Sequence, residues 1–146
     1  MALSVEDNLE FIISNYFVFP QNEKTFLLND SIITTLKLEQ KIEIFKSICR
    51  AEKIEDGKVN KIVAAIRYVQ RVRNRVAHDE GYMFDPKEGI RLHKRKSGWH
   101  TKDELIITDD IVKEVDKNRL YAIRGLVDIH IELSDVSRKK EPEIIG

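Results

Sequence analysis

The residue types with the greatest chemical potential in this chain lie together at positions 73–78, in the sequence RNRVAH. Asn74 and His78 are four residues apart, so on a helix they share a face. The amide can then fix the orientation of the imidazole, which is a proton-transfer group. Five residues turn a helix by about 140°, so Arg73 and His78 do not share a stripe. Either the long Arg73 side chain reaches around the helix, or a two-fold partner brings a second copy of the motif alongside.

The same stretch has an ordinary structural explanation. Arginine and histidine near the C-terminus of a helix interact favourably with its dipole, by roughly 0.3–1 kcal/mol each. Against this explanation, Asn74 is a poor helix former, placed inside a helix that still needs its last turn. The residue pattern by itself leaves both interpretations open.

Apolar spacing predicts four long helices that position the motif. They are expected at about 4–19, 29–52, 58–78 and 109–137, with a loop at about 21–29. Ser4 with Asp7 resembles a capping box at the first helix, and Thr108 can cap the fourth. The third helix, which carries the motif, is expected to direct six residues to the core: Val59, Ile62, Val63, Ile66, Val69 and Val76.

A different pattern separates the third and fourth helices. Residues 90–93 alternate apolar and polar, residues 97–98 read as a turn, and residues 105–107 can return as a second strand. We expect a β-hairpin at about 88–107 that shares the core through Ile90, Leu92 and Ile106. The predicted fold class is therefore all-α, an up-and-down four-helix bundle with an inserted β-hairpin. One domain is expected over 1–137, followed by a loose charged tail at 138–146.

Composition limits the possible partners. Among 146 residues, 42% are hydrophobic and 34% charged, with 25 basic against 25 acidic residues, so any nucleic-acid contact must come from a local patch. The single cysteine, Cys49, excludes an intrachain disulfide and is expected to be a small buried hydrophobe. No secretion signal and no membrane-spanning run stand out, so a cytoplasmic protein without membrane attachment is the simplest expectation.

Several catalytic signatures are missing from the sequence. It has no glycine-rich phosphate loop, no paired cysteines, no His-Glu-x-x-His and no serine nucleophile elbow. The four histidines show no metal-ligand spacing, so neither a metal nor a cofactor is predicted. His130 lies on the apolar face of the fourth helix and is expected to be a core or rim residue.

The hairpin offers a second, weaker candidate site. Basic residues surround Trp99, and such a ribbon can hold single-stranded nucleic acid by charge and stacking. The cluster comprises Arg91, His93, Lys94, Arg95, Lys96, His100 and Lys102. Asp103 and Glu104 dilute it, so a solubilised hairpin with a packed tryptophan is the favoured alternative.

The stretch at 73–78 resembles the signature of the HEPN superfamily, in which Arg-Asn-x-x-Ala-His lies late in a long helix of a helical bundle. The resemblance covers residues 1–135, and the hairpin lies outside the minimal helical pattern. It implies metal-independent RNA cleavage by a homodimer whose motifs meet at the two-fold axis. In this chain Arg73 would stabilise the phosphate, His78 would transfer protons, and Asn74 would orient His78 or contact the phosphate. Arg75 is a weaker candidate for contacting RNA.

Three functions compete at this point. The first is a HEPN-type endoribonuclease, such as a toxin with a partner antitoxin or a defence protein, and the joint presence of Arg, Asn and His favours it. The second is a catalytically silent HEPN-like dimerisation or binding module, which the neutral overall charge favours. A helical DNA-binding regulator is the weakest, because no basic recognition helix is visible.

Overall fold

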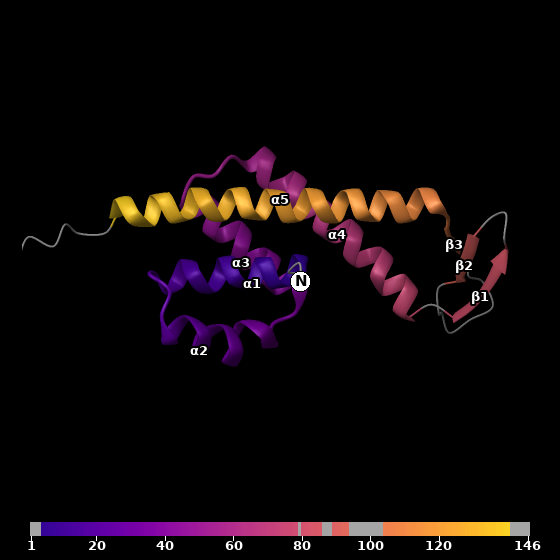
Figure 1. Ribbon diagram of the computed structural model, residues 1–146, viewed down its shortest axis with the longest axis horizontal. Helices are drawn as coiled ribbons and strands as arrows, with labels where there is room; N and C mark the ends of the chain where they lie inside the picture. The colour runs from indigo at the N-terminus through magenta and orange to yellow at the C-terminus, as the bar shows by residue number, and fades with distance from the viewer. Residues whose placement is uncertain (1–3, 79, 86–88, 94–103, 141–146) are drawn as a thin grey trace, which may run out of the picture. The chain divides into compact units, whose positions relative to one another are not determined.

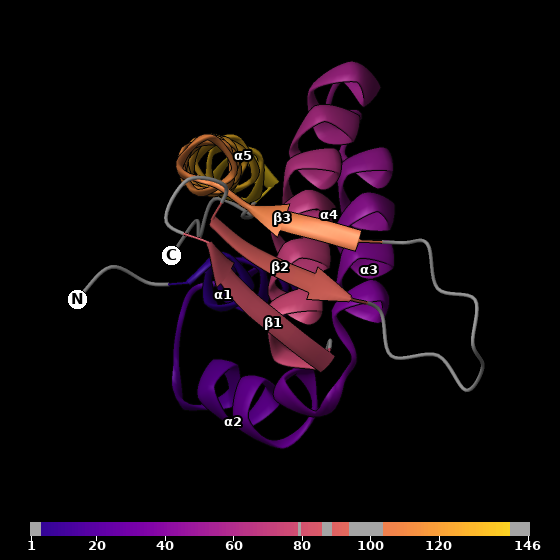
Figure 2. The same ribbon diagram turned by 90° about the vertical axis from the view of Figure 1, so that its right-hand side faces the viewer.

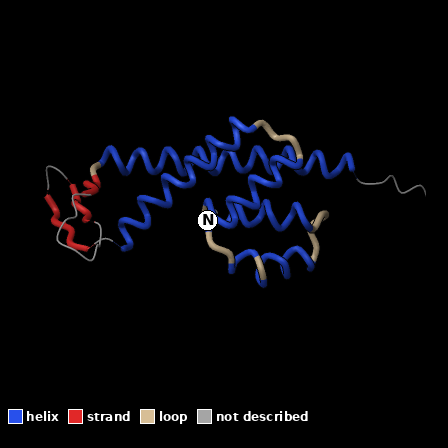
Figure 3. Tube along the Cα trace, turned by 180° about the vertical axis from the view of Figure 1, so that it is seen from behind, coloured by secondary structure: helices blue, strands red, loops and turns tan. Residues whose placement is uncertain are grey.

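A computed structural model describes residues 4–78, 80–85, 89–93 and 104–140 (Figure 1). The chain is mostly helical in these ranges, as predicted, and its strands are confined to one stretch (Figure 3). The helices are α1 (Val5–Phe17), α2 (Glu23–Ser31), α3 (Leu38–Ala51), α4 (Asp56–His78) and α5 (Asp109–Lys140), with a short 3-10 helix η1 (Ile33–Thr35). The strands are β1 (Glu80–Asp85), β2 (Gly89–His93) and β3 (Glu104–Ile107).

The chain divides into two compact units. The first contains the described residues up to Val63 and from Ala122 onward, and the second contains Ala64–Tyr121. Helices α4 and α5 each contribute to both units. The single-domain boundary at residue 137 stays a prediction.

The predicted capping box at the start of α1 is confirmed. Ser4 Oγ accepts a hydrogen bond from the Asp7 backbone N–H at 3.0 Å, and Asp7 Oδ2 accepts one from the Ser4 N–H at 3.2 Å. These bonds satisfy two backbone donors that the first turn leaves without helical partners. Thr108 likewise caps α5, because its Oγ1 accepts from the Ile111 N–H at 3.2 Å.

The region between α1 and α3 differs from the prediction. Residues expected to form a loop instead form α2, which begins at a capping box in which the Asn22 side chain accepts from the Lys24 N–H and Thr25 Oγ1 accepts from the Asn22 N–H. The helix expected from residue 29 begins only at Leu38. Between them lie four β-branched residues, 32–35, whose low helix propensity and side-chain bonds to the backbone interrupt the helix.

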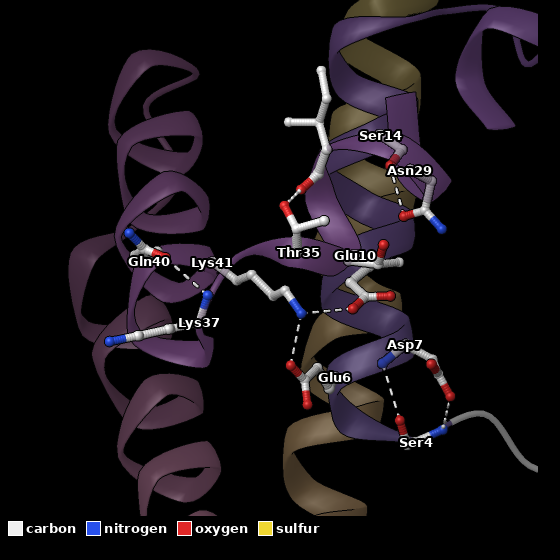
Figure 4. Close-up of polar contacts among 12 residues, drawn as sticks. Ser4, Glu6, Asp7, Glu10, Ser14, Asn29, Thr35, Lys37, Gln40 and Lys41 are labelled. Atoms are coloured by element: carbon white, nitrogen blue, oxygen red, sulfur yellow. Dashed lines mark hydrogen bonds and ion pairs between the residues drawn. The ribbon is translucent and has the colours of Figure 1, made fainter. Parts of the chain in front are cut away.

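The first unit has a well-packed apolar core. Helix α1 packs on α2 and α3. The buried apolar side chains come from α1, η1, α3, the first part of α4 and the last part of α5. The largest of them that are fully buried and apolar are Leu9, Ile13, Ile42, Phe45, Ile62, Leu126 and Ile129. Lys41 is buried among them at 2% exposure and is held by two carboxylates of α1 (Figure 4).

The second unit contains a three-stranded antiparallel sheet in which β2 lies between β1 and β3 (Figure 2). The predicted hairpin corresponds to β2 and β3, which pair with Ile90 opposite Ile107 and Leu92 opposite Leu105. Strand β1 was not predicted. Gly89 has a φ of 95°, and a Cβ there would overlap the Ile107 carbonyl oxygen, so glycine is required at this bend.

Two expectations concern the apolar side chains of the sheet and the C-terminal tail. The side chains of Ile90 and Leu92 lie outside the described part of the structure, whereas Ile106 is half-buried. Helix α5 continues to Lys140, so the prediction of a loose tail from residue 138 is wrong for its first three residues. Residues 141–146 lie outside the described residues. Among the described residues, no helix is both long enough and apolar enough to cross a membrane.

Candidate functional site

The motif lies on the last turns of α4, a helix of 23 residues. The buried stripe of α4 includes Val59, Ile62, Val63, Ile66 and Val69, all of which were predicted to face the core. Beyond Val69 the helix becomes more exposed, and the prediction that Val76 faces the core is wrong, because its exposed fraction is 55%. The residues of the motif therefore lie at the end of α4, beyond its buried stripe.

Arg73 and Asn74 are both exposed. The side-chain Oδ1 of Asn74 accepts a hydrogen bond from Gln70 Nε2 at 2.9 Å. This bond orients the Asn74 amide, since its oxygen faces Gln70 and its two N–H donors are left for another acceptor. Gln70 was not singled out from the sequence, although its spacing of four residues from Asn74 is the signal that could have identified it.

The other predicted motif residues are described to different degrees. His78 is the last residue of α4, and its side chain lies outside the described part of the structure, so its expected pairing with Asn74 stays a prediction. Arg75 is half-buried and takes part in an interaction of its own. Arg73 makes no hydrogen bond or ion pair with another residue that the structure describes.

An apolar groove runs beside the motif within the second unit. Its volume is about 340 Å³, and Arg73 is the one charged residue among the described residues that line it. The remaining lining residues are Val72, Val76, Ala77, Ile107, Ile111, Val112 and Val115. Val76 and Val112 are 55% and 56% exposed, so the groove leaves apolar surface in water next to an arginine. The sequence analysis missed the α5 side of this groove; the apolar spacing of residues 111, 112 and 115 was its signal.

Most side chains of the hairpin candidate lie outside the described part of the structure. Arg91 lies opposite Ile106 in the sheet, but its side chain is outside the described part. Arg95, Lys96 and Trp99 lie outside the described residues altogether, as do the basic residues at 94, 100 and 102. Their proposed contact with RNA stays a prediction.

Two other side chains that could react, those of Cys49 and His130, are buried and half-buried, respectively. Cys49 is 1% exposed, and burial raises the pKa of its thiol to about 12, so it is not a nucleophile near neutral pH. The His130 ring lies 5.0 Å from the Phe11 ring, and burial lowers the pKa of His130, as suits the predicted rim residue. Among the described residues, no group of three or more His, Cys, Asp or Glu is placed to hold a metal ion.

Comparison with known proteins identifies no relative: no family model, no curated protein and no solved structure matches the chain.

Proposed function

We propose that this protein is a metal-independent endoribonuclease of the HEPN type, built as an up-and-down helical bundle with the sheet inserted before α5. The observation that carries the proposal is the RNRVAH sequence at the end of α4, where Arg73 and Asn74 are exposed beside an apolar groove. A structural cap needs no asparagine here, and Arg73 has no carboxylate partner among the described residues.

The proposed reaction uses the nucleophile that RNA itself carries. His78, or its copy in a second subunit, removes the proton from a ribose 2′-OH, and the oxygen attacks the adjacent phosphorus. Arg73 stabilises the negative charge that accumulates on the phosphate. The bond from phosphorus to the 5′-oxygen breaks, and this oxygen takes up a proton. The products are a 2′,3′-cyclic phosphate and a free 5′-hydroxyl.

The proposal includes a homodimer, because Arg73 and His78 lie about 140° apart around one helix and a second copy of the motif would complete the site. The apolar groove supplies a surface for it. The groove includes Arg73, so a second copy seated there would bring its own α4 end to the same place. Val76 and Val112 are already nearly half-buried, so burying them completely in such a contact is favourable by about half of the roughly 1.5–3 kcal/mol that full burial of an exposed side chain gives. An antitoxin or other protein partner remains a proposal that rests on the same family resemblance.

The test is RNA cleavage by the pure protein in the presence of a chelator. We expect cleavage that yields a 2′,3′-cyclic phosphate, and no cleavage of a substrate with a 2′-deoxyribose at the cut site. His78→Ala should lower the rate on the order of 10²–10⁴-fold, and Arg73→Ala on the order of 10²–10³-fold. Arg71→Ala is the matched control, because Arg71 is exposed on the same helix and lies over the Tyr68 ring instead of in the motif.

The role of Asn74 has its own variant. Gln70→Glu is nearly isosteric, but an ionised carboxylate only accepts hydrogen bonds, so the Asn74 amide must turn its N–H donors toward residue 70. If these donors serve the reaction, kcat falls while the thermal midpoint stays unchanged. Unaltered cleavage by Gln70→Glu would contradict a role for this amide orientation.

The competing proposal is a silent HEPN-like module that dimerises without cutting. The bond from Gln70 to Asn74 favours it, because it occupies the amide oxygen within the helix. A wild-type protein that forms dimers but cleaves no RNA would support this second function in place of the first. Equal rates of RNA cleavage by the wild type and by His78→Ala would do the same.

A further inference from the structure

A small polar pocket lies in the first unit, away from every residue used in the proposed cleavage. Its volume is about 220 Å³. It is lined from α1, from α2 and from the connection between them, by Asp7, Glu10, Phe11, Ser14, Asn15, Gln21, Thr25, Phe26 and Asn29.

The Asn15 side chain offers this pocket an oxygen that nothing in the described chain uses. Asn15 is 9% exposed, and its Nδ2 donates to the Phe11 carbonyl oxygen at 2.8 Å. Because a carbonyl only accepts, this bond fixes the amide with its nitrogen inward and its Oδ1 on the other side. The Oδ1 has no hydrogen-bond partner among the described residues. No fully buried side-chain oxygen or nitrogen there lacks one, so this oxygen is accessible to solvent, and Asn15 lines the pocket.

The charge of the pocket is negative. Glu10 is 12% exposed and places one oxygen 2.7 Å from Lys41 Nζ, while its second oxygen points away from Lys41 (Figure 4). Lys41 also binds Glu6, so two carboxylates share one cation and a net negative charge remains. Asp7 adds a further carboxylate at the rim, and the described residues that line the pocket include no lysine or arginine.

The remaining walls add aromatic surface. Phe11 and Phe26 line the pocket and are 39% and 58% exposed. Ser14 Oγ donates to Asn29 Oδ1 at 3.0 Å, and the Asn29 nitrogen turns away from Ser14 (Figure 4). The pocket therefore combines carboxylates, an unused amide oxygen and phenyl rings, which together suit a cation with several donors and a flat face.

We propose that this pocket binds a guanidinium group. A guanidinium is planar, carries five N–H donors and stacks on aromatic rings, whereas an ammonium is compact and strongly hydrated. Its donors match Asn15 Oδ1, the free oxygen of Glu10 and the Asp7 carboxylate. The volume accepts a guanidinium on a short chain, which either a free small molecule or the arginine side chain of a peptide can supply.

The test is a titration of the wild-type protein, monitored through the amide chemical shifts in its NMR spectra. The probes are agmatine and a capped arginine that mimics a peptide residue. The ammonium controls are butylamine and putrescine, because putrescine keeps the second ammonium of agmatine and replaces its guanidinium by another ammonium. We expect saturable shifts of the lining residues with both guanidinium probes, and much weaker binding of both controls. Agmatine binding more tightly would assign the site to a small molecule, and the capped arginine binding more tightly would assign it to a peptide; either result supports the proposal.

Two variants locate the binding. Asn15→Ala removes the acceptor and should weaken agmatine binding on the order of ten- to a hundredfold, as for a hydrogen bond to a charged group. Asp7→Asn removes the charge, keeps an oxygen for the cap, and should weaken binding severalfold. Asn60→Ala, at an exposed position of α4, should leave it unchanged. Shifts that do not saturate, butylamine or putrescine binding as tight as that of agmatine, or undiminished binding by a folded Asp7→Asn and Asn15→Ala would overturn the proposal.

Discussion

The Lys41→Met variant tests how the buried charges of the first unit contribute to stability. Lys41 Nζ lies 2.7 Å from a carboxylate oxygen of Glu6 and 2.7 Å from one of Glu10, and its side chain is 2% exposed (Figure 4). Methionine fills a similar volume with an apolar chain, so the substitution creates little cavity. What it removes is the cation that these two carboxylates share.

The expected loss follows from the exposure of each carboxylate. Removing one partner of a fully buried ion pair costs about 3–5 kcal/mol, because an uncompensated charge stays behind. Glu6 is 40% exposed and can regain water, whereas Glu10 is 12% exposed and regains much less. We therefore expect a loss of about 3 kcal/mol, near the lower end of that range. For a chain of this length it lowers the melting temperature by about 6–12 °C.

The measurement is urea unfolding of the wild type, Lys41→Met and the double variant Lys41→Met/Glu10→Leu. The double variant also removes the stranded carboxylate, so it should recover to within about 1 kcal/mol of the wild type. Lys46→Met is the control, because its 3.7 Å pair with Glu43 leaves Glu43 61% exposed to water, so its removal should change stability by less than about 0.5 kcal/mol. A double variant no more stable than Lys41→Met would refute the electrostatic reasoning and point to lost packing.

The pH dependence of this contribution has a definite sign. Burial lowers the pKa of Lys41, but hydrogen bonds and charge attraction from Glu10 and Glu6 raise it by more, so the folded pKa lies above its ordinary value of 10.5. A raised pKa stabilises the fold below the unfolded value, and this stabilisation is lost as pH rises through the folded value. The difference in unfolding free energy between the wild type and Lys41→Met should stay constant from about pH 7 to 10 and shrink above pH 10.5.

Three further predictions concern packing, reactivity and assembly. Gly125→Ala places a Cβ 2.6 and 2.7 Å from two carbons of Ile62, so it should lower the unfolding free energy by about 1–3 kcal/mol in urea titrations. Cys49, with its pKa raised to about 12, should react with iodoacetamide at pH 8 only in denaturant, and rapid labelling of the native protein would contradict its burial. Val112→Asp places a charge in the apolar groove and should convert the proposed dimer to a monomer in light scattering. Val127→Asp, at a residue of α5 that is 43% exposed and lies outside the groove, should not.

The sequence predicted elements best where local signals and periodicity agreed. The capping box at Ser4, the cap at Thr108 and the pairing of β2 with β3 follow from local turn and cap chemistry, whereas α4 begins at Asp56, two residues before its expected start. Helix α2 was missed because it shows almost no amphipathic pattern: Phe26 and Leu27 are exposed, while Thr25 is its one buried residue. Its existence depends on a cap whose acceptor is Asn22, a residue that also suits loops.

Tertiary contacts were harder to predict than elements. The apolar repeat of α4 was extended to Val76, but periodicity reports only which residues share a face and not where the covering elements end. Lys41 was missed for a similar reason: a lysine on an apolar face signals nothing until a second helix places carboxylates beside it. The pocket beside Asn15 depends on α2 and could not be expected from a sequence interpretation that lacked this helix.

Stability and the proposed chemistry are carried by different parts of α4. The buried stripe of the helix reaches Val69 at 7% exposure, whereas Arg73 and Asn74 four or five residues later are exposed. Substitutions at exposed positions outside caps and ion networks change stability by less than about 0.5 kcal/mol. Arg73→Ala should therefore keep the wild-type melting temperature. If light scattering shows that the variant still dimerises, a loss of RNA cleavage measures transition-state stabilisation, because neither the core nor the assembly has changed.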